Sequence, residues 1–291
     1  MQGYTEEYTN IVMKSLKIAI PKIQLFFKDW ITNISIEKVK KIDAFKKNID
    51  IEKDYFITFN YTNVLENIYG VKNICHVHGN QNTDIIFGHG DLYNIKFQFS
   101  EFDKLKDKKF EVKRSLKPKK EKYYSHYLSL NDIKMAKYLL YNNECSFVQR
   151  KMIKNLKNIE EDFNFFCREE NEHRTNEAYL KKSKGIEQGI MQLYLGLKKD
   201  TTTALRTVIK FLCSIKETEE IKNIFSIGFS YSDVDMKIID IIGLLDATSW
   251  YINNYRFDNI YEYMYKIYRC TRDIDIHIFD FKSEYSLHDY L

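Results

Sequence analysis

The sequence predicts an α/β fold in which a mainly parallel sheet is interrupted by a long helical insertion. Short runs rich in β-branched and aromatic residues alternate with helix-periodic segments in residues 51–91 and 221–291. Between them, residues 92–220 are charged and helix-periodic, with no convincing strand pattern. We therefore expect three parts: an N-terminal helical segment (1–50) that packs on the core, an α/β domain (51–91 plus 221–291), and a helical insertion (92–220).

The first half of the predicted α/β domain contains three strand-like runs. Residues 5–45 before it have helical periodicity, and Pro21 is expected to break or start a helix there. "YFITF" fits a strand buried on both faces, and "NICHV" and "DIIF" are the next two strands. Between the first two, "NVLENIY" predicts a short helix with Thr62 as N-cap and Gly70 as its end. Such a helical crossover makes the first two strands parallel.

The remaining elements follow the same alternation. The insertion predicts the helices "LNDIKMAKYLLY", "FVQRKMIKNLKNIEEDFNFFCR", "GIEQGIMQLYLGLKK" and "TALRTVIKFLCSI". After it come a strand at "NIFSIGF", a helix from Asp233 through "MKIIDIIGLL", and a strand at "TSWYI". A helix at "NIYEYMYKIYR" and a last strand at "IDIHIFDF" complete the expected βαβ series.

Composition narrows the class of protein. Hydrophobic residues make up 44% and charged residues 30% of the 291 residues, which is ordinary for a soluble globular protein. The five cysteines show no CxxC spacing, so we expect reduced thiols in a cytoplasmic protein. We find neither a membrane-spanning run nor a signal-peptide pattern. A net charge of +4 does not call for a nucleic-acid partner.

Polar side chains follow four of the predicted strands. Asn60, His78 and His89 each come after one strand, and Ser230 and Asp233 follow a fourth. Any one of them is typical of a turn or helix cap. Parallel strands present their carboxyl ends at one edge, where α/β proteins bind ligands. The set therefore predicts a site at that edge.

The chemistry of these residues suits a nucleotide site. A histidine can act as a general base near neutral pH, and an asparagine can hold a water or a ribose hydroxyl without adding charge. In "GFSYSDVD", Gly228 allows close approach of the backbone, and Ser230 and Asp233 stand at a helix start. Helix starts favour phosphate and ribose oxygens.

Four segments in this order, "FITFNYTNVLENIYG", "HVHGN", "IIFGHGD" and "IFSIGFSYSDVDMKIID", resemble the AbiH family of phage abortive-infection proteins. The resemblance covers roughly residues 22–91 and 220–291. That family is in turn similar to sirtuin-like NAD-binding proteins. The resemblance implies a Rossmann-like sheet, a role in anti-phage defence, and NAD or a related nucleotide as ligand or substrate. It also implies possible hydrolysis of NAD at the nicotinamide–ribose bond.

The resemblance also implies roles for individual residues. Asn60 matches the sirtuin-like asparagine that positions a water or the ribose, and His78 matches the histidine that acts as base or contacts the ribose. Ser230 and Asp233 match the segment that lines the rest of the nucleotide site. The further expected pocket residues are Thr58, Tyr61, His76, His89, Gly228 and Asp235.

One family feature has no counterpart here. The family opens with a strand and a Gly-rich turn of the form GNGFD, whereas Gly3 is the only glycine before Gly70. Such a turn provides the main pyrophosphate contact of a Rossmann-like site. We expect a truncated, split or degenerate member of the family, in which that contact is missing or a partner chain supplies the N-terminal segment; a homo-oligomer is the other expected assembly.

Two other functions fit parts of the sequence. A metal-dependent hydrolase or nuclease would use His76 and His78, which share one face of a strand, together with His89 and Asp91. A non-catalytic nucleic-acid or protein-binding module would use the segment 104–122, with ten basic and three acidic residues. Such basic runs are more often solvated helix faces or loops.

Overall fold

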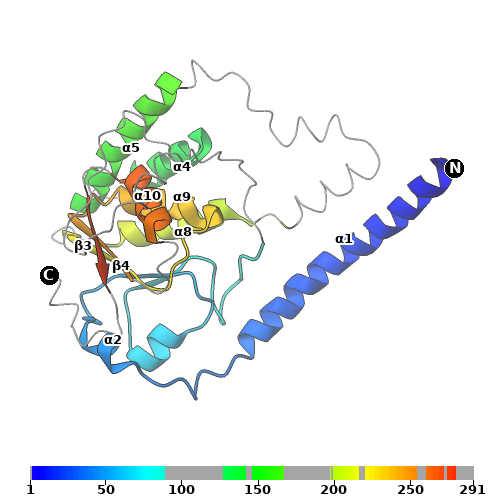
Figure 1. The fold of residues 1–291 in the computed structure, drawn as a ribbon, viewed down its shortest axis with the longest axis horizontal. Helices are drawn as coiled ribbons and strands as arrows, with labels where there is room; N and C mark the ends of the chain where they lie inside the picture. The colour runs from blue at the N-terminus through cyan, green and yellow to red at the C-terminus, as the bar shows by residue number, and fades with distance from the viewer. Residues whose placement is uncertain are drawn as a thin grey trace.

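The chain forms a body of helices and two small parallel sheets, from which helix α1 (Gln2–Thr32) runs outward (Figure 1). The computed structural model describes residues 2–88, 127–141, 146–166, 197, 199–215, 220–253, 260–271 and 274–279. The predicted helix "GIEQGIMQLYLGLKK", the basic segment 104–122, His89 and Asp91 lie outside these ranges, apart from residues 197 and 199 of the predicted helix.

Within the described ranges, the two sheets contain five parallel strands. β1 (Phe56–Thr58) pairs with β2 (Ile74–His76), so that Thr58 lies opposite His76. In the second sheet, β4 (Ser249–Asn253) lies between β3 (Asn223–Ser226) and β5 (Asp275–Phe279). The predicted alternation of strands and helices is confirmed as a mixed α/β fold, divided into two sheets within the described residues.

The predicted strand at "DIIF" is wrong. Residues 84–87 have no regular secondary structure. The backbone N–H of Ile86 donates to the carbonyl of His78 at 2.8 Å, but this single bond does not extend into a ladder. A strand needs repeated pairing with a neighbour, and an apolar run alone does not supply it.

The crossover between β1 and β2 is a π-helix, Leu65–Tyr69. Gly70 ends it in the left-handed conformation (φ 77°), as the sequence predicts, because glycine adopts that conformation without a Cβ clash. Thr62 is not its N-cap. Val64 occupies that position and makes no side-chain capping bond.

The N-terminal segment is helical but differs from the prediction in detail. α1 passes through Pro21 without ending, and a separate short helix, α2 (Asp43–Lys47), follows an irregular stretch. Pro21 is exposed, so water can solvate the carbonyl that lacks its helical donor. The predicted break at Pro21 is therefore wrong.

The remaining helices are α4 (Leu130–Tyr141), α5 (Phe147–Phe166), α8 (Thr201–Cys213), α9 (Met236–Gly243) and α10 (Ile260–Cys270). A 3₁₀ turn, η2 (Asp233–Asp235), leads directly into α9. Their buried apolar residues form a core with most of those of the sheets, whereas Tyr251 and Phe279 form a small separate cluster on the second sheet. α8 packs against both β2 and α9, and this brings together chain segments that are far apart in sequence. Among the described helices, none has the length and apolar character that crossing a membrane requires.

Candidate functional site

Three charged or titratable side chains meet beyond the carboxyl ends of β2 and β3. His78 follows β2, Asp235 ends η2, and Lys199 lies just before α8. His78 Nε2 is 3.0 Å from Asp235 Oδ1 and 2.7 Å from Lys199 Nζ. Lys199 Nζ also donates to Asp235 Oδ1 at 3.0 Å. We call this group the His78 cluster; its side chains are 4%, 14% and 8% exposed for His78, Asp235 and Lys199.

The fold explains this meeting. α8 packs against β2 on one side and α9 on the other. Lys199 precedes α8, and Asp200 caps that helix by accepting the N–H of Thr203 at 2.9 Å. Asp235 immediately precedes α9. The starts of the two helices and the end of β2 therefore converge on one point.

His78 has one ring nitrogen without a partner. Nδ1 is shielded from solvent and makes no hydrogen bond within the described residues. A proton on Nε2 would be donated to Asp235, which would leave Nδ1 as an acceptor; a lone pair on Nε2 would accept from Lys199, which would make Nδ1 a donor. In both states Nδ1 is free to bond a further group, and leaving a buried polar atom unpaired costs about 1–3 kcal/mol.

The cluster holds Asp235 in its ionised form. Burial by itself raises the pKa of this carboxyl, but the hydrogen bond from His78 and the charge of Lys199 outweigh burial and hold the pKa below its usual value. A buried lysine beside a carboxylate keeps the group of charges close to neutral. His78 thus contacts a fixed anion and a fixed cation at the same nitrogen.

Aromatic rings border the cluster. The ring of His78 lies 5.5 Å from that of Phe59 and 6.3 Å from that of Tyr61. Phe59, which follows β1, packs at 4.4 Å against Phe229, which follows β3. The Tyr61 hydroxyl donates to the carbonyl of Ile86 at 3.1 Å. Burial, and then the charge of Asp235, raise the pKa of Tyr61, so its hydroxyl stays a neutral donor.

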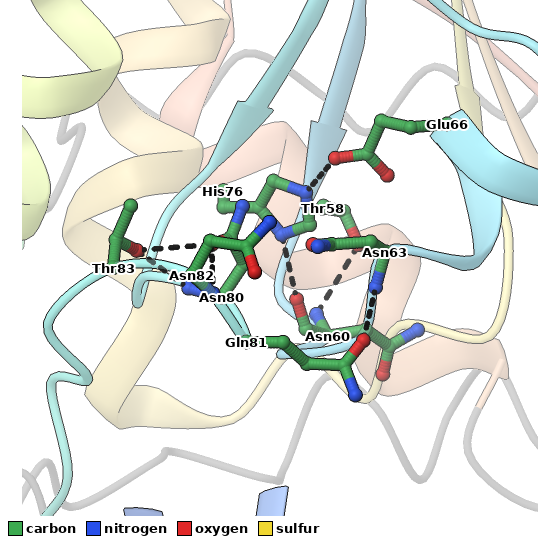
Figure 2. A network of polar contacts seen from close by, with 9 residues as sticks. All are labelled: Thr58, Asn60, Asn63, Glu66, His76, Asn80, Gln81, Asn82 and Thr83. Carbon is green, nitrogen blue, oxygen red and sulfur yellow. Dashed lines mark hydrogen bonds and ion pairs between the residues drawn. The ribbon is translucent and has the colours of Figure 1, made fainter. Parts of the chain in front are cut away.

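A second histidine–carboxylate pair lies at the end of β2, beside the end of β1 (Figure 2). His76 Nε2 is 2.7 Å from Glu66 Oε1 on the π-helix, and His76 Nδ1 is 3.0 Å from the carbonyl oxygen of Asn60. A carbonyl oxygen only accepts, so the Nδ1–H of His76 donates to it, and a second proton lies between Nε2 and the Glu66 carboxyl group. Nδ1 of His76 therefore holds the backbone of Asn60, while its Nε2 is engaged by Glu66.

Asn60 is less central than the sequence suggests. Its backbone N–H donates to Thr58 Oγ1 at 3.2 Å, and its side chain points away from the ring of His76 (Figure 2). Asn60 is exposed, and no hydrogen bond joins it to His78 in the part of the chain that the structure describes. Asn60 and His78 thus follow two neighbouring strands, as expected, but within the described residues no hydrogen bond joins them.

The turn after β3 is strained and tightly held. Gly228 and Tyr231 both have positive φ (64° and 50°), and Tyr231 is fully buried. Buried Lys266 donates to the carbonyl of Tyr231 at 2.8 Å and pairs with Asp233 at 2.9 Å and Glu262 at 2.8 Å. Left-handed non-glycine residues tend to occur at functional turns. Asp233 is thereby turned toward Lys266 and away from the His78 cluster.

The structure thus brings together His78, Asp235 and Tyr61 from the predicted set. Ser230 and Gly228 are exposed on the turn. Thr58 and His76 instead belong, with Glu66, to the contacts around Asn60, which we call the Asn60 network. Lys199 and Glu66 were not among the predicted site residues. Glu66 could have been found as the carboxylate on the crossover between two polar strand ends, whereas the "KKD" around Lys199 gives no local signal.

The geometry does not favour the predicted metal site. His76 and His78 have separate partners, and an ammonium group lies beside His78 Nε2. Within the described ranges, no group of three or more His, Cys, Asp or Glu side chains is placed to hold a metal ion.

Comparison with known proteins gives one match. The family model described as "Bacteriophage abortive infection AbiH" matches residues 1–253, which include both the His78 cluster and the Asn60 network. No curated protein and no solved structure matches the chain.

Proposed function

Because the chain belongs to the AbiH family of bacteriophage abortive-infection proteins, we propose that its His78 cluster is the reactive centre of a defence enzyme that acts on a nucleotide. Abortive infection is the biological role that family membership assigns. Hydrolysis of NAD at the nicotinamide–ribose bond is the specific reaction we propose. Such a reaction would deplete NAD and stop the metabolism of the infected host.

The observation that carries this proposal is the state of His78. A buried histidine with Nε2 anchored on a carboxylate and Nδ1 unpaired has the arrangement of a general base. The carboxylate orients the ring and stabilises the proton that the ring gains. Lys199, by pairing with Asp235, keeps that carboxylate ionised.

The proposed reaction uses water as nucleophile. Water attacks C1′ of the nicotinamide ribose, the C1′–N bond breaks, and its electron pair stays on the nicotinamide nitrogen. The proton released by the water passes to Nδ1 of His78. Nicotinamide and ADP-ribose are the products.

The surrounding residues suit the nicotinamide–ribose half of the substrate. Tyr61, Phe59 and Phe229 provide aromatic surface beside His78. The strands of both sheets are parallel, and Phe59 after β1 packs against Phe229 after β3. These features support a Rossmann-like arrangement with the site at the carboxyl ends of the strands. The exposed turn at Gly228 and Ser230 is our candidate for contact with the rest of the nucleotide.

The test is incubation of the purified chain with NAD and related nucleotides, with nicotinamide release followed by chromatography and binding by calorimetry. We expect His78→Ala to abolish release and Asp235→Asn to reduce it by about 10²-fold or more. His277→Ala is the matched control, because His277 stacks on Tyr251 in the other sheet at 4.8 Å. Wild-type chain that neither binds nor cleaves any nucleotide would refute the proposal.

A further inference from the structure

Helix α1 carries an exposed patch in its C-terminal half. Phe26 is 67% and Trp30 62% exposed, and Ile23 and Leu25 are 51% and 57% exposed. Two exposed charged residues, Lys22 and Asp29, lie on the same part of the helix. We call these six residues the α1 patch. α1 runs out from the body (Figure 1), and the exposed fractions of its apolar residues show that another molecule can reach them.

The patch exposes about as much apolar surface as one partner contributes to a standard protein interface. Its four apolar side chains expose together roughly 400 Å² of apolar surface, taking about 100 Å² for a fully exposed aliphatic side chain and about 200 Å² for an aromatic one. A standard interface buries about 800 Å² on each partner, of which about 57% is apolar. Phe26 and Trp30 belong to the aromatic residue types that dominate binding energy.

The charges in the patch are arranged for a two-fold pair. Lys22 and Asp29 stand four residues before and three residues after Phe26 on the helix. Neither has an ion pair within the described part of the chain, although Lys28 nearby pairs with Asp84 at 3.1 Å. When two copies of α1 cross antiparallel near Phe26, Lys22 of each copy faces Asp29 of the other. A parallel crossing would place Lys22 against Lys22.

We propose that the α1 patch is a self-association interface, in which two copies of this chain pair their α1 helices antiparallel with Phe26 at the crossing. Two-fold pairs use the same surface on both copies, so the surface must complement itself. An apolar centre with one positive and one negative flank meets that condition. Antiparallel pairing also aligns the two helix dipoles favourably.

The pairing would act close to the His78 cluster. Phe27, next to Phe26, contacts the rings of Tyr61 at 5.4 Å and Phe87 at 4.6 Å. Tyr61 in turn lies beside His78. A second copy bound at Phe26 would therefore be separated from His78 by Phe27 and Tyr61. The self-association proposal does not depend on the reaction proposed for the His78 cluster.

The test measures oligomeric state by light scattering coupled to size-exclusion chromatography and by sedimentation equilibrium of the whole chain. We expect a dimer for the wild type, and Phe26→Glu to weaken it by about 100-fold. Ile11→Glu is the matched control: Ile11 is 58% exposed on the same helix but lies outside the patch, so this variant should remain dimeric. Far-UV circular dichroism should be unchanged in both variants.

A charge-exchange series tests the orientation. Lys22→Glu and Asp29→Lys should each weaken the dimer by about 5-fold, and the double variant should recover most of that loss because the exchanged charges again face opposite partners. A wild-type monomer at the highest soluble concentration would overturn the proposal. A dimer equally sensitive to Phe26→Glu and Ile11→Glu, or no recovery in the double variant, would do the same.

Discussion

His78 and Asp235 are 157 positions apart in the chain, yet Nε2 of the histidine lies 3.0 Å from Oδ1 of the carboxylate. The contact joins the end of the β1–β2 sheet to the turn that follows β3. It is completed by Lys199, which reaches both groups from the start of α8. The His78 cluster therefore ties together the two sheets and the helix packed against them.

Asp235→Asn should remove a pH-dependent part of the stability. The pKa of Asp235 is lowered in the folded chain. The stabilisation that its carboxylate contributes to the free energy of unfolding is therefore present above the pKa that Asp235 has in the unfolded chain. This stabilisation is lost as the pH falls through the lower pKa of the folded chain. We expect the wild type to exceed Asp235→Asn by about 2 kcal/mol in free energy of unfolding at neutral pH, with the difference narrowing below about pH 4. Urea unfolding at a series of pH values measures it. Asp84→Asn, which alters a fully exposed carboxylate, should follow the wild-type curve.

Lys199 and Asp235 should act as a coupled pair. Replacing either one leaves the other buried without its main partner, whereas replacing both removes that penalty. We expect Lys199→Met and Asp235→Asn to be less than additive in the double variant, by about 1–2 kcal/mol in a double-mutant cycle of unfolding free energies. Fully additive values would mean that the 3.0 Å contact contributes nothing to stability.

Two glycines near the site should differ sharply in their tolerance of alanine. A Cβ on Gly79 would lie 1.8 Å from the carbonyl oxygen of Asp84, and Gly79 also has a positive φ of 78°. Gly228 has φ 64° but open space around its missing Cβ. Gly228→Ala should cost about 1–2 kcal/mol, the cost of the left-handed conformation alone, whereas Gly79→Ala should cost about 3 kcal/mol or more because backbone must also move. Thermal and urea unfolding of the two variants compares them directly.

Gln81 should control how firmly α1 is held. Its side-chain N–H groups donate to the carbonyls of Ile31 and Ile34 at 3.0 and 2.9 Å, which satisfies acceptors at the end of the helix. Gln81→Glu would replace this donor with a carboxylate facing two carbonyl oxygens, at a cost of about 2 kcal/mol. Hydrogen exchange should become faster in the last turns of α1. Gln24→Glu, the same change within α1, should leave exchange there unchanged.

Much of the local structure could be predicted because local composition determines it. Runs such as "YFITF" and "NICHV" combine buried apolar residues with β-branched or aromatic side chains, and both contain strands. Gly70 ends its helix because a left-handed residue was needed there. The strand predicted at "DIIF" failed because an apolar run specifies burial without specifying a backbone partner.

The site was predictable only in part. Position after a strand was enough to single out His78, since parallel strands end at a common edge. The same rule gave equal weight to Asn60 and Asp233, whose actual roles depend on neighbours that the rule does not include. His76 holds the backbone of Asn60, and Lys266 draws Asp233 to itself.

The sequence by itself determined the alternation of strands and helices, the candidate histidine and the family to which the chain belongs. Only the tertiary structure decided that Lys199 and Asp235 are the partners of His78. The physical reason is one of range. Backbone preference and burial depend on a few neighbouring residues, so the local sequence predicts them. An ion pair instead forms where helix packing brings charged atoms from distant parts of the chain within about 3 Å of each other. Here the packing of α8 against β2 and α9 brings Lys199, His78 and Asp235 together.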